Sequence, residues 1–314
     1  MRLAIIDCGT NTFHLLIVEK SADGIFKELF KSKANVKLGE KGISRDYISE
    51  EPFKRGIEAL RRFRKEIDRH QATKIIAFAT AAIRNAKNAK EFMHAANEEA
   101  DISIAVISGE REAELIYHGV RKALDLGDSS SLIMDIGGGS TEFIIANSTT
   151  IFWKKSFKLG ASLLLEKFQP SDPIQTREID SMNNYFTETL VPLMDACKQF
   201  QPNILIGSSG SFETFSEMIL KKMPATSALK DQTSYRFNLQ EYINLHQELI
   251  RSTLAERREM KGLVHMRIEM IVIASLLLTF VLDKTGISQM KLSTYALKEG
   301  MLAELLEKGG ILEK

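Results

Sequence analysis

Several features that define other protein classes are scarce in this sequence. Its 314 residues include only two cysteines, Cys8 and Cys197, which excludes a disulfide framework or a cysteine-rich zinc site and leads us to expect a reducing, cytoplasmic compartment. The six histidines show no metal-ligand spacing. A formal net charge of +1 argues against nucleic acid as a general partner. The longest apolar run, residues 271–282, is too short to span a bilayer and predicts a buried helix instead of a membrane contact.

The remaining composition is that of a globular protein with two domains. Hydrophobic residues make up 44% and charged residues 26%, and strand-like and helix-like periodicities alternate, which predicts an α/β architecture. The order of elements starts again after residues 125–131 (DLGDSSS), a stretch with Gly and Ser but no apolar periodicity. We therefore predict one domain over residues 1–125 and a second over residues 126–294.

The periodicity also predicts the individual elements. The expected strands are residues 3–7, 13–19, 26–38, 74–79, 102–107, 132–135, 142–146, 151–159 and 203–206. The expected helices include residues 50–70, 89–100, 109–124 and 271–282, and the chain after residue 206 is expected to be mostly helical.

Two glycine-containing segments share one order of residue types. Residues 3–17 (LAIIDCGTNTFHLLI) and 132–141 (LIMDIGGGST) each pass from an apolar run to an aspartate, then to glycine and to hydroxyl or amide side chains. Such a turn can point successive N–H groups at a phosphate. Asp7 and Asp135 would repel a bare phosphate, so they make chemical sense if a divalent cation, Mg²⁺ above all, lies between carboxylates and phosphoryl oxygens. For either copy alone, a tight hairpin capped by its own aspartate is the structural alternative.

A third glycine-containing segment, residues 205–215 (LIGSSGSFETF), follows an apolar strand and opens a helix. The N–H groups at the start of that helix can hold another anion near Gly210 and Ser211. Ser211 acting as an ordinary N-cap would explain the same residues.

Two further segments carry charged side chains beside predicted strands. Residues 106–120 hold three acids, Glu110, Glu112 and Glu114. One of these is a candidate base, although acids in the first turns of a helix usually face water. Residues 78–92 hold three bases, Arg84, Lys87 and Lys90. These bases either line the mouth of a cleft or lie on a solvated helix start.

Six segments together resemble one known family. They are IIDCGTNTFHLLIVE, FATAAIRNAKN, ISGEREAELIYHGV, MDIGGGSTEFII, GSSGSFET and STYALKEGMLAE. In this order they resemble the Ppx/GppA family of exopolyphosphatases and guanosine pentaphosphate phosphohydrolases. The resemblance implies an actin-like (sugar kinase/Hsp70/actin) α/β fold with two ribonuclease-H-like domains facing a central phosphate-binding cleft. It also implies that a final helix, about residues 295–308 within the C-terminal segment 295–314, packs back on the first domain.

The resemblance implies roles for individual residues. Glu112 matches the catalytic glutamate that orients or deprotonates the attacking water, and Glu142 matches a second acid beside the cleft. Asp7, Asp135 and Glu142 are the expected metal ligands. The expected phosphate-binding residues are Gly9, Asn11, Thr12, Arg84, Gly137, Gly138, Ser140, Gly210 and Ser211.

The implied activity is release of the terminal phosphate from inorganic polyphosphate, guanosine pentaphosphate or both. Mg²⁺ is the expected cofactor, with Mn²⁺ as the alternative ion, and a homodimer is the expected assembly. The chain departs from the family in carrying Ile273-Ala274 where members often have a proline-glycine pair, and it stops at Lys314 where longer members continue. Because of the second departure, we do not expect processive hydrolysis of long polyphosphate chains.

Two other functions remain open from the sequence. An ATP-dependent small-molecule kinase of the same superfamily would need an adenine pocket near residues 207–210. A non-catalytic sensor would close its cleft on guanosine tetraphosphate and signal to a partner. Intact Glu112 and Glu142 speak against the sensor, because a sensor has little need for a base.

Overall fold

The computed structural model describes residues 1–21, 26–222 and 232–307, so the last part of the predicted C-terminal segment, residues 308–314, lies outside the described residues. The first part of the chain comprises β1 (Arg2–Cys8), β2 (Thr12–Lys20), β3 (Phe26–Asn35), α1 (Glu50–Arg69), β4 (Lys74–Ala79), α2 (Ala81–Asn85), α3 (Ala89–Ala100), β5 (Ile104–Val106) and α4 (Gly109–Ala123).

The second part begins after the expected boundary at residues 125–131. It comprises β6 (Ser131–Ile136), β7 (Thr141–Ala146), β8 (Ile151–Phe157), α5 (Ala161–Phe168), α6 (Thr176–Thr189), α7 (Val191–Phe200), β9 (Ile204–Ser208), α8 (Ser209–Leu220), β10 (Ser234–Arg236), α9 (Leu239–Arg251), α10 (Leu254–Glu259), α11 (Ile271–Thr285), β11 (Met290–Ser293) and α12 (Leu297–Glu307).

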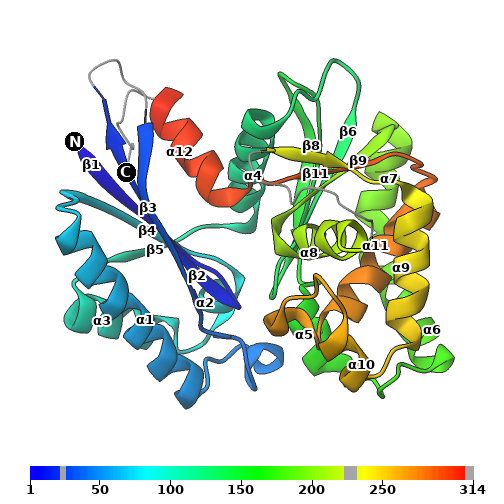
Figure 1. Cartoon of the computed structure of the whole chain (residues 1–314), viewed down its shortest axis with the longest axis horizontal. Helices are drawn as coiled ribbons and strands as arrows, with labels where there is room; N and C mark the ends of the chain where they lie inside the picture. The colour runs from blue at the N-terminus through cyan, green and yellow to red at the C-terminus, as the bar shows by residue number, and fades with distance from the viewer. Residues whose placement is uncertain (22–25, 223–231, 308–314) are drawn as a thin grey trace.

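Each part forms one β-sheet, and the two sheets repeat one topology (Figure 1). The N-terminal sheet has the order β3-β2-β1-β4-β5, and the C-terminal sheet has the order β10-β11-β9-β6-β7-β8. In both sheets the first three strands along the chain pair antiparallel, and the fourth then pairs parallel with the first. The duplication expected from the two Asp-Gly segments is therefore confirmed, and the chain has the two-domain actin-like fold.

The expected strands and helices are present, with differences at their ends, and the further elements include three short ones. Strand β3 ends at Asn35 instead of residue 38 because the N–H groups of Val36 and Lys37 both donate to the carbonyl of Asn11. The chain after residue 206 also contains strands β10 and β11, and α2 follows β4 directly. These elements have only three to five residues, too few to show a periodicity.

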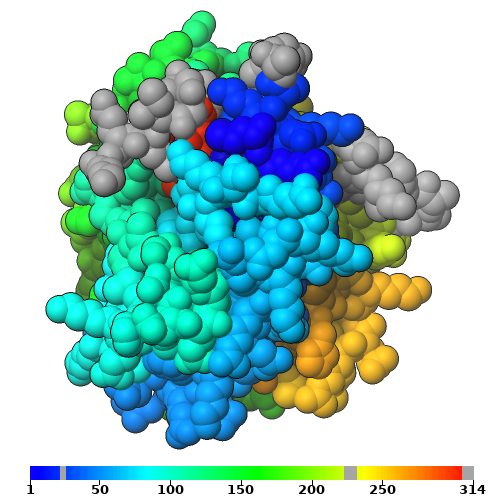
Figure 2. Space-filling view, turned by 90° about the vertical axis from the view of Figure 1, so that its left-hand side faces the viewer, coloured from blue at the N-terminus to red at the C-terminus, as the bar shows by residue number. Residues whose placement is uncertain are grey.

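Helices cover the outer face of the N-terminal sheet. Helix α1 buries Ile57, Leu60, Phe63 and Ile67, a spacing that places them on one face of the helix. Figure 2 views this side of the molecule, where the segment that contains α1 and α3 forms much of the surface. The core beneath α1 includes Ile6 of β1, whereas Ile5 of the same strand faces the opposite side.

The opposite side of the N-terminal sheet faces a core that it shares with the C-terminal sheet. This core joins Ile5 of β1 and Ile133 of β6 to side chains of α4 and α12, two helices that lie between the sheets (Figure 1). A Cβ on Gly119 of α4 would collide with the Ala296 carbonyl oxygen, and a Cβ on Gly300 of α12 would collide with the Leu115 carbonyl oxygen. Glycine at both positions thus lets α12 cross α4 at backbone contact.

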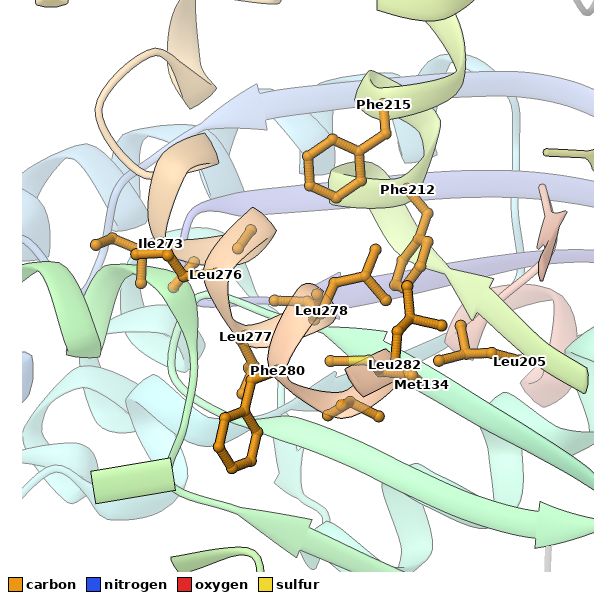
Figure 3. Close-up of a cluster of buried hydrophobic side chains, with 14 of the residues drawn as sticks. Met134, Leu205, Phe212, Phe215, Ile273, Leu276, Leu277, Leu278, Phe280 and Leu282 are labelled. Carbon is orange, nitrogen blue, oxygen red and sulfur yellow. The ribbon is translucent and has the colours of Figure 1, made fainter. Parts of the chain in front are cut away.

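The apolar run predicted as a buried helix is α11, and nearly all of its residues are buried. Figure 3 shows its side chains surrounded by Met134 and Leu205 of the C-terminal sheet and by Phe212 and Phe215 of α8. Ile273-Ala274, the pair at which the chain departs from the family, lies inside this helix and is also buried. In the described part of the chain, no helix is long and apolar enough to cross a membrane.

Candidate active site

A cavity of about 200 Å³ lies where the ends of both sheets meet the start of α8 and α12. Most of the predicted site residues line it: Asp7, Gly9, Asn11, Thr12, Glu112, Asp135, Gly137, Gly138, Ser140, Gly210 and Ser211. Arg84 and Glu142 are absent from the lining, and so are Lys87 and Lys90, which are exposed. The structure therefore brings all three glycine-containing segments to one cavity.

The two Asp-Gly loops have the same local geometry and touch each other. A Cβ on Gly9 would lie 2.9 Å from the Thr12 carbonyl oxygen, and a Cβ on Gly137 would lie 3.0 Å from that of Ser140. A Cβ on Gly138 would lie 2.7 Å from Asn11 Nδ2 in the opposite loop. The glycine triplet thus has a packing reason that the sequence does not reveal, since it lets the two loops meet across the cavity.

A polar row crosses four strands of the C-terminal sheet, and one of its residues, Asp135, lines the cavity. Strand register pairs Ser208 with Asp135, Asp135 with Glu142, and Glu142 with Ser156, so the four side chains share one face of the sheet. Ser208 Oγ donates to Asp135 Oδ2 at 2.6 Å, and Ser156 Oγ donates to Glu142 Oε1 at 2.6 Å. Two acids in direct register are thus held between two hydroxyl donors.

Both acids of this row have raised pKa values. Burial raises the pKa of Asp135, and the hydroxyls of Ser208 and Ser209 oppose that rise. Burial, then the charges of Glu112 and Asp135, hold the pKa of Glu142 well above its usual range. Because each neighbouring carboxylate disfavours ionisation of the next, the site favours a bound positive charge.

A second polar row crosses the N-terminal sheet and lines the cavity from the other side. Register pairs Asp7 with His14 and His14 with Lys33. Burial raises the pKa of Asp7 to about 7, with Lys298 lowering it and Asp135 adding to the rise. Within the described residues, Asp7 Oδ1 is buried without a hydrogen-bond partner.

Glu112 reaches the cavity from the first turn of α4. Ser108 caps this helix, its Oγ accepting the N–H of Arg111 at 3.1 Å, and Glu112 lies on the buried face. Arg84 Nη1 donates to Glu112 Oε2 at 2.7 Å and to the Ile107 carbonyl at 3.2 Å. Burial raises the pKa of Glu112 to about 7, although Arg84 opposes this rise. Arg84 therefore contacts Glu112 in this structure, and its expected contact with phosphate stays a prediction.

The residues present fit a divalent cation held by Asp7 and Asp135. Mg²⁺ usually takes one or two protein carboxylates and completes its shell with water and substrate phosphate. Asp7 Oδ1 is an unsatisfied buried acceptor, and the charge of Asp135 adds to the rise in the pKa of Asp7. In the described ranges, no three acidic, histidine or cysteine side chains are placed so that they could hold a metal ion together. Glu142 lies off the lining and accepts a hydrogen bond from Ser156, so its expected role as a third metal ligand stays a prediction.

Several lining side chains were not predicted from the sequence, among them His14, Arg267 and Lys298. A Cβ on Gly210 would collide with the Arg267 guanidinium, so this glycine makes room for a cation beside the third segment. The N-cap of α8 is Ser208, and Ser211, weighed as an N-cap from the sequence, instead lies within the first turn. Arg267 and Lys298 are both distant in sequence from the glycine loops. Lys298 lies in the segment STYALKEGMLAE, which carries the family resemblance without indicating a role for this lysine, and Arg267 lies outside the six segments.

Comparison with known proteins identifies the family. The family model for Ppx/GppA phosphatases matches residues 16–309. An exopolyphosphatase from Cytophaga hutchinsonii superposes with a TM-score of 0.94 at 40% identity, covering 98% of both chains. A family member from Aquifex aeolicus superposes with a TM-score of 0.80 at 23% identity, covering 99% of both chains, which supports the fold. A match over nearly the whole sequence, together with the paired loops around one cavity, shows that this chain belongs to the Ppx/GppA phosphatase family.

Proposed function

We propose that this phosphohydrolase releases the terminal phosphate from inorganic polyphosphate, from guanosine pentaphosphate, or from both. The observation that carries the proposal is Glu112, a buried carboxylate that lines the cavity between the two loops and has a pKa of about 7. A base with a pKa near the working pH transfers protons efficiently. The similar protein from Cytophaga hutchinsonii, an exopolyphosphatase, supports the substrate class.

In the proposed reaction, water attacks the terminal phosphorus while Glu112 accepts its proton. Arg84, bonded to Glu112 and to the Ile107 carbonyl, keeps the carboxylate in one orientation. Burial raises the pKa of Glu112 and makes it a better acceptor than an exposed glutamate, so kcat/KM should rise with pH as the free enzyme passes through about pH 7.

The two loops hold the phosphate that is transferred. Their glycines and the hydroxyl groups of Thr12 and Ser140 line the cavity on opposite sides, which lets both domains contact one phosphoryl group. A divalent cation on Asp7 and Asp135 would supply charge neutralisation for the phosphoryl oxygens. Catalysis of this kind relies on positioning and electrostatic stabilisation more than on covalent chemistry.

A phosphate-release assay with Mg²⁺ tests the proposal. We expect release from polyphosphate or guanosine pentaphosphate, and little from ATP. Phosphate release from neither of the first two would contradict the proposal. Transfer of the ATP γ-phosphate to a small molecule would instead support the kinase.

A further inference from the structure

The polar row of the N-terminal sheet leads from the interior of the cavity to its mouth. Asp7, His14 and Lys33 lie in register on three neighbouring strands, so the row spans two strand spacings, about 10 Å. All three side chains line the cavity, and Lys33 at the outer end is exposed. The row thus offers a path along which an extended ligand can leave the reacting site.

Lys298 faces the inner end of this row from α12. Its side chain is 16% exposed, and its Nζ lies 3.1 Å from Glu299 Oε1, the partner it has among the described residues. An ammonium group has three donors, so donors remain for a ligand in the cavity. Helix α12, which carries Lys298, crosses α4, which carries Glu112, in close contact at Gly300 and Gly119. This contact fixes the position of Lys298 relative to Glu112.

The charges in the cavity explain why these lysines matter. The lining contains four acids, Asp7, Glu112, Asp135 and Glu213. A polyanion can enter such a cavity only if cations offset these groups. Burial lowers the pKa of His14 to about 3, with Lys298 and Lys33 adding to this effect, so the imidazole is neutral at neutral pH. The lining cations that act on His14 are thus Lys298, Lys33 and Arg267, and of these the two lysines lie at the inner and outer ends of the row.

We propose that Lys298 and Lys33 form an extended phosphate subsite. In this subsite Lys298 binds phosphoryl oxygens beside Asp7, and Lys33 binds a phosphate closer to the mouth. The proposal rests on the proposed function for its substrate class, and it adds a direction: the chain leaves the reacting site along the N-terminal sheet. It also implies that Lys298 acts on every substrate, whereas Lys33 acts mainly on chains long enough to reach the mouth.

Binding of tripolyphosphate and of a long-chain polyphosphate, measured by calorimetry at low salt, tests this order. Lys298→Met should weaken binding of both ligands by about 10- to 100-fold, the range for a partly buried charge-assisted hydrogen bond, and Lys298→Arg should restore most of it. Lys33→Met should weaken long-chain binding by about 2- to 5-fold, as for an exposed charge, with a smaller effect on tripolyphosphate. In turnover, Lys33→Met should raise KM for the long chain more than it lowers kcat.

Lys27→Met is the matched control, because Lys27 is an exposed lysine on the same strand that lies outside the cavity. The subsite is wrong if Lys298→Met binds tripolyphosphate as the wild type does, or if Lys33→Met and Lys27→Met bind long chains equally well. Failure of the wild type to release phosphate, with these binding differences intact, would remove the hydrolase proposal and leave the subsite standing.

Discussion

The polar rows of the two sheets, which reach the cavity at Asp7 and Asp135, differ in how fully their side chains are hydrogen-bonded. In the C-terminal sheet, Asp135 and Glu142 each accept a hydroxyl hydrogen bond at 2.6 Å from a serine in register. In the N-terminal sheet, Asp7 Oδ1 is buried without a partner within the described residues, and the row runs outward to an exposed lysine. One row is closed by its own protein partners, and the other leaves acceptors and donors for a ligand.

We call the row of the C-terminal sheet (Ser208, Asp135, Glu142 and Ser156) the supporting half of the site, and the row of the N-terminal sheet (Asp7, His14 and Lys33) the receiving half. Hydrogen bonds that are already made hold the C-terminal acids in place before substrate arrives, which is the preorganisation that electrostatic catalysis needs. An unpartnered buried carboxylate costs free energy unless a ligand completes it. Asp7 is therefore the position at which binding of a cation should have the largest effect.

Removing divalent cations should have the largest effect of all. A chelator should abolish turnover and Mg²⁺ should restore it, because Asp7 and Asp135 oppose a polyanion unless a cation lies between them. Asp7→Asn should raise the Mg²⁺ concentration needed for half-maximal activity and weaken Mg²⁺ binding measured by calorimetry. Full activity in excess chelator would contradict a metal role for the receiving half.

Replacing Glu112, which lies between the two rows, should have the next largest effect. Glu112→Gln keeps the size of the side chain and a hydrogen bond to Arg84 but loses the base, so kcat should fall by about 100-fold or more. Polyphosphate binding should change little. The variant should also lose the rise of kcat/KM near pH 7 that the raised pKa predicts.

Glu110→Gln is the control for this variant, since Glu110 belongs to the same helical turn but does not line the cavity. If both variants released phosphate at the wild-type rate, Glu112 would be another helix carboxylate and its assignment as the base would be wrong.

Breaking the hydroxyl contacts of the supporting half should have the smallest effect. Ser208→Ala removes a buried donor to Asp135 and should lower the free energy of unfolding by about 1–3 kcal/mol. Ser156→Ala should cost less, because Ser156 is only half-buried. Urea denaturation measures both. If Ser156→Ala lowered the free energy of unfolding as much as Ser208→Ala or more, burial of the hydroxyl would not decide how much each contact stabilises the protein.

The sequence predicted those features of the molecule that depend on residues close together in the chain. Asp7 and Asp135 end apolar strands and precede glycine turns, and both line the cavity as expected. The contact of Gly138 with Asn11, by contrast, depends on how two distant loops meet, and neither loop alone specifies it.

The lining residues that the sequence did not predict also depend on contacts between distant parts of the chain. Lys298 reaches the cavity because α12 crosses α4 at two glycines, and Arg267 does so because Gly210 leaves space for it. Glu112 could be separated from Glu110 and Glu114 only through the family resemblance, because all three acids suit the start of a helix. Burial, which distinguishes Glu112, is a property of the tertiary structure.

The most direct test of the central claim is the source of the oxygen in the released phosphate. Hydrolysis of polyphosphate in isotopically labelled water should place one solvent oxygen in each released orthophosphate and none in the shortened chain, as measured by mass spectrometry. This follows from water attacking the terminal phosphorus beside Glu112. Solvent oxygen in the shortened chain, or released phosphate without it, would contradict the account.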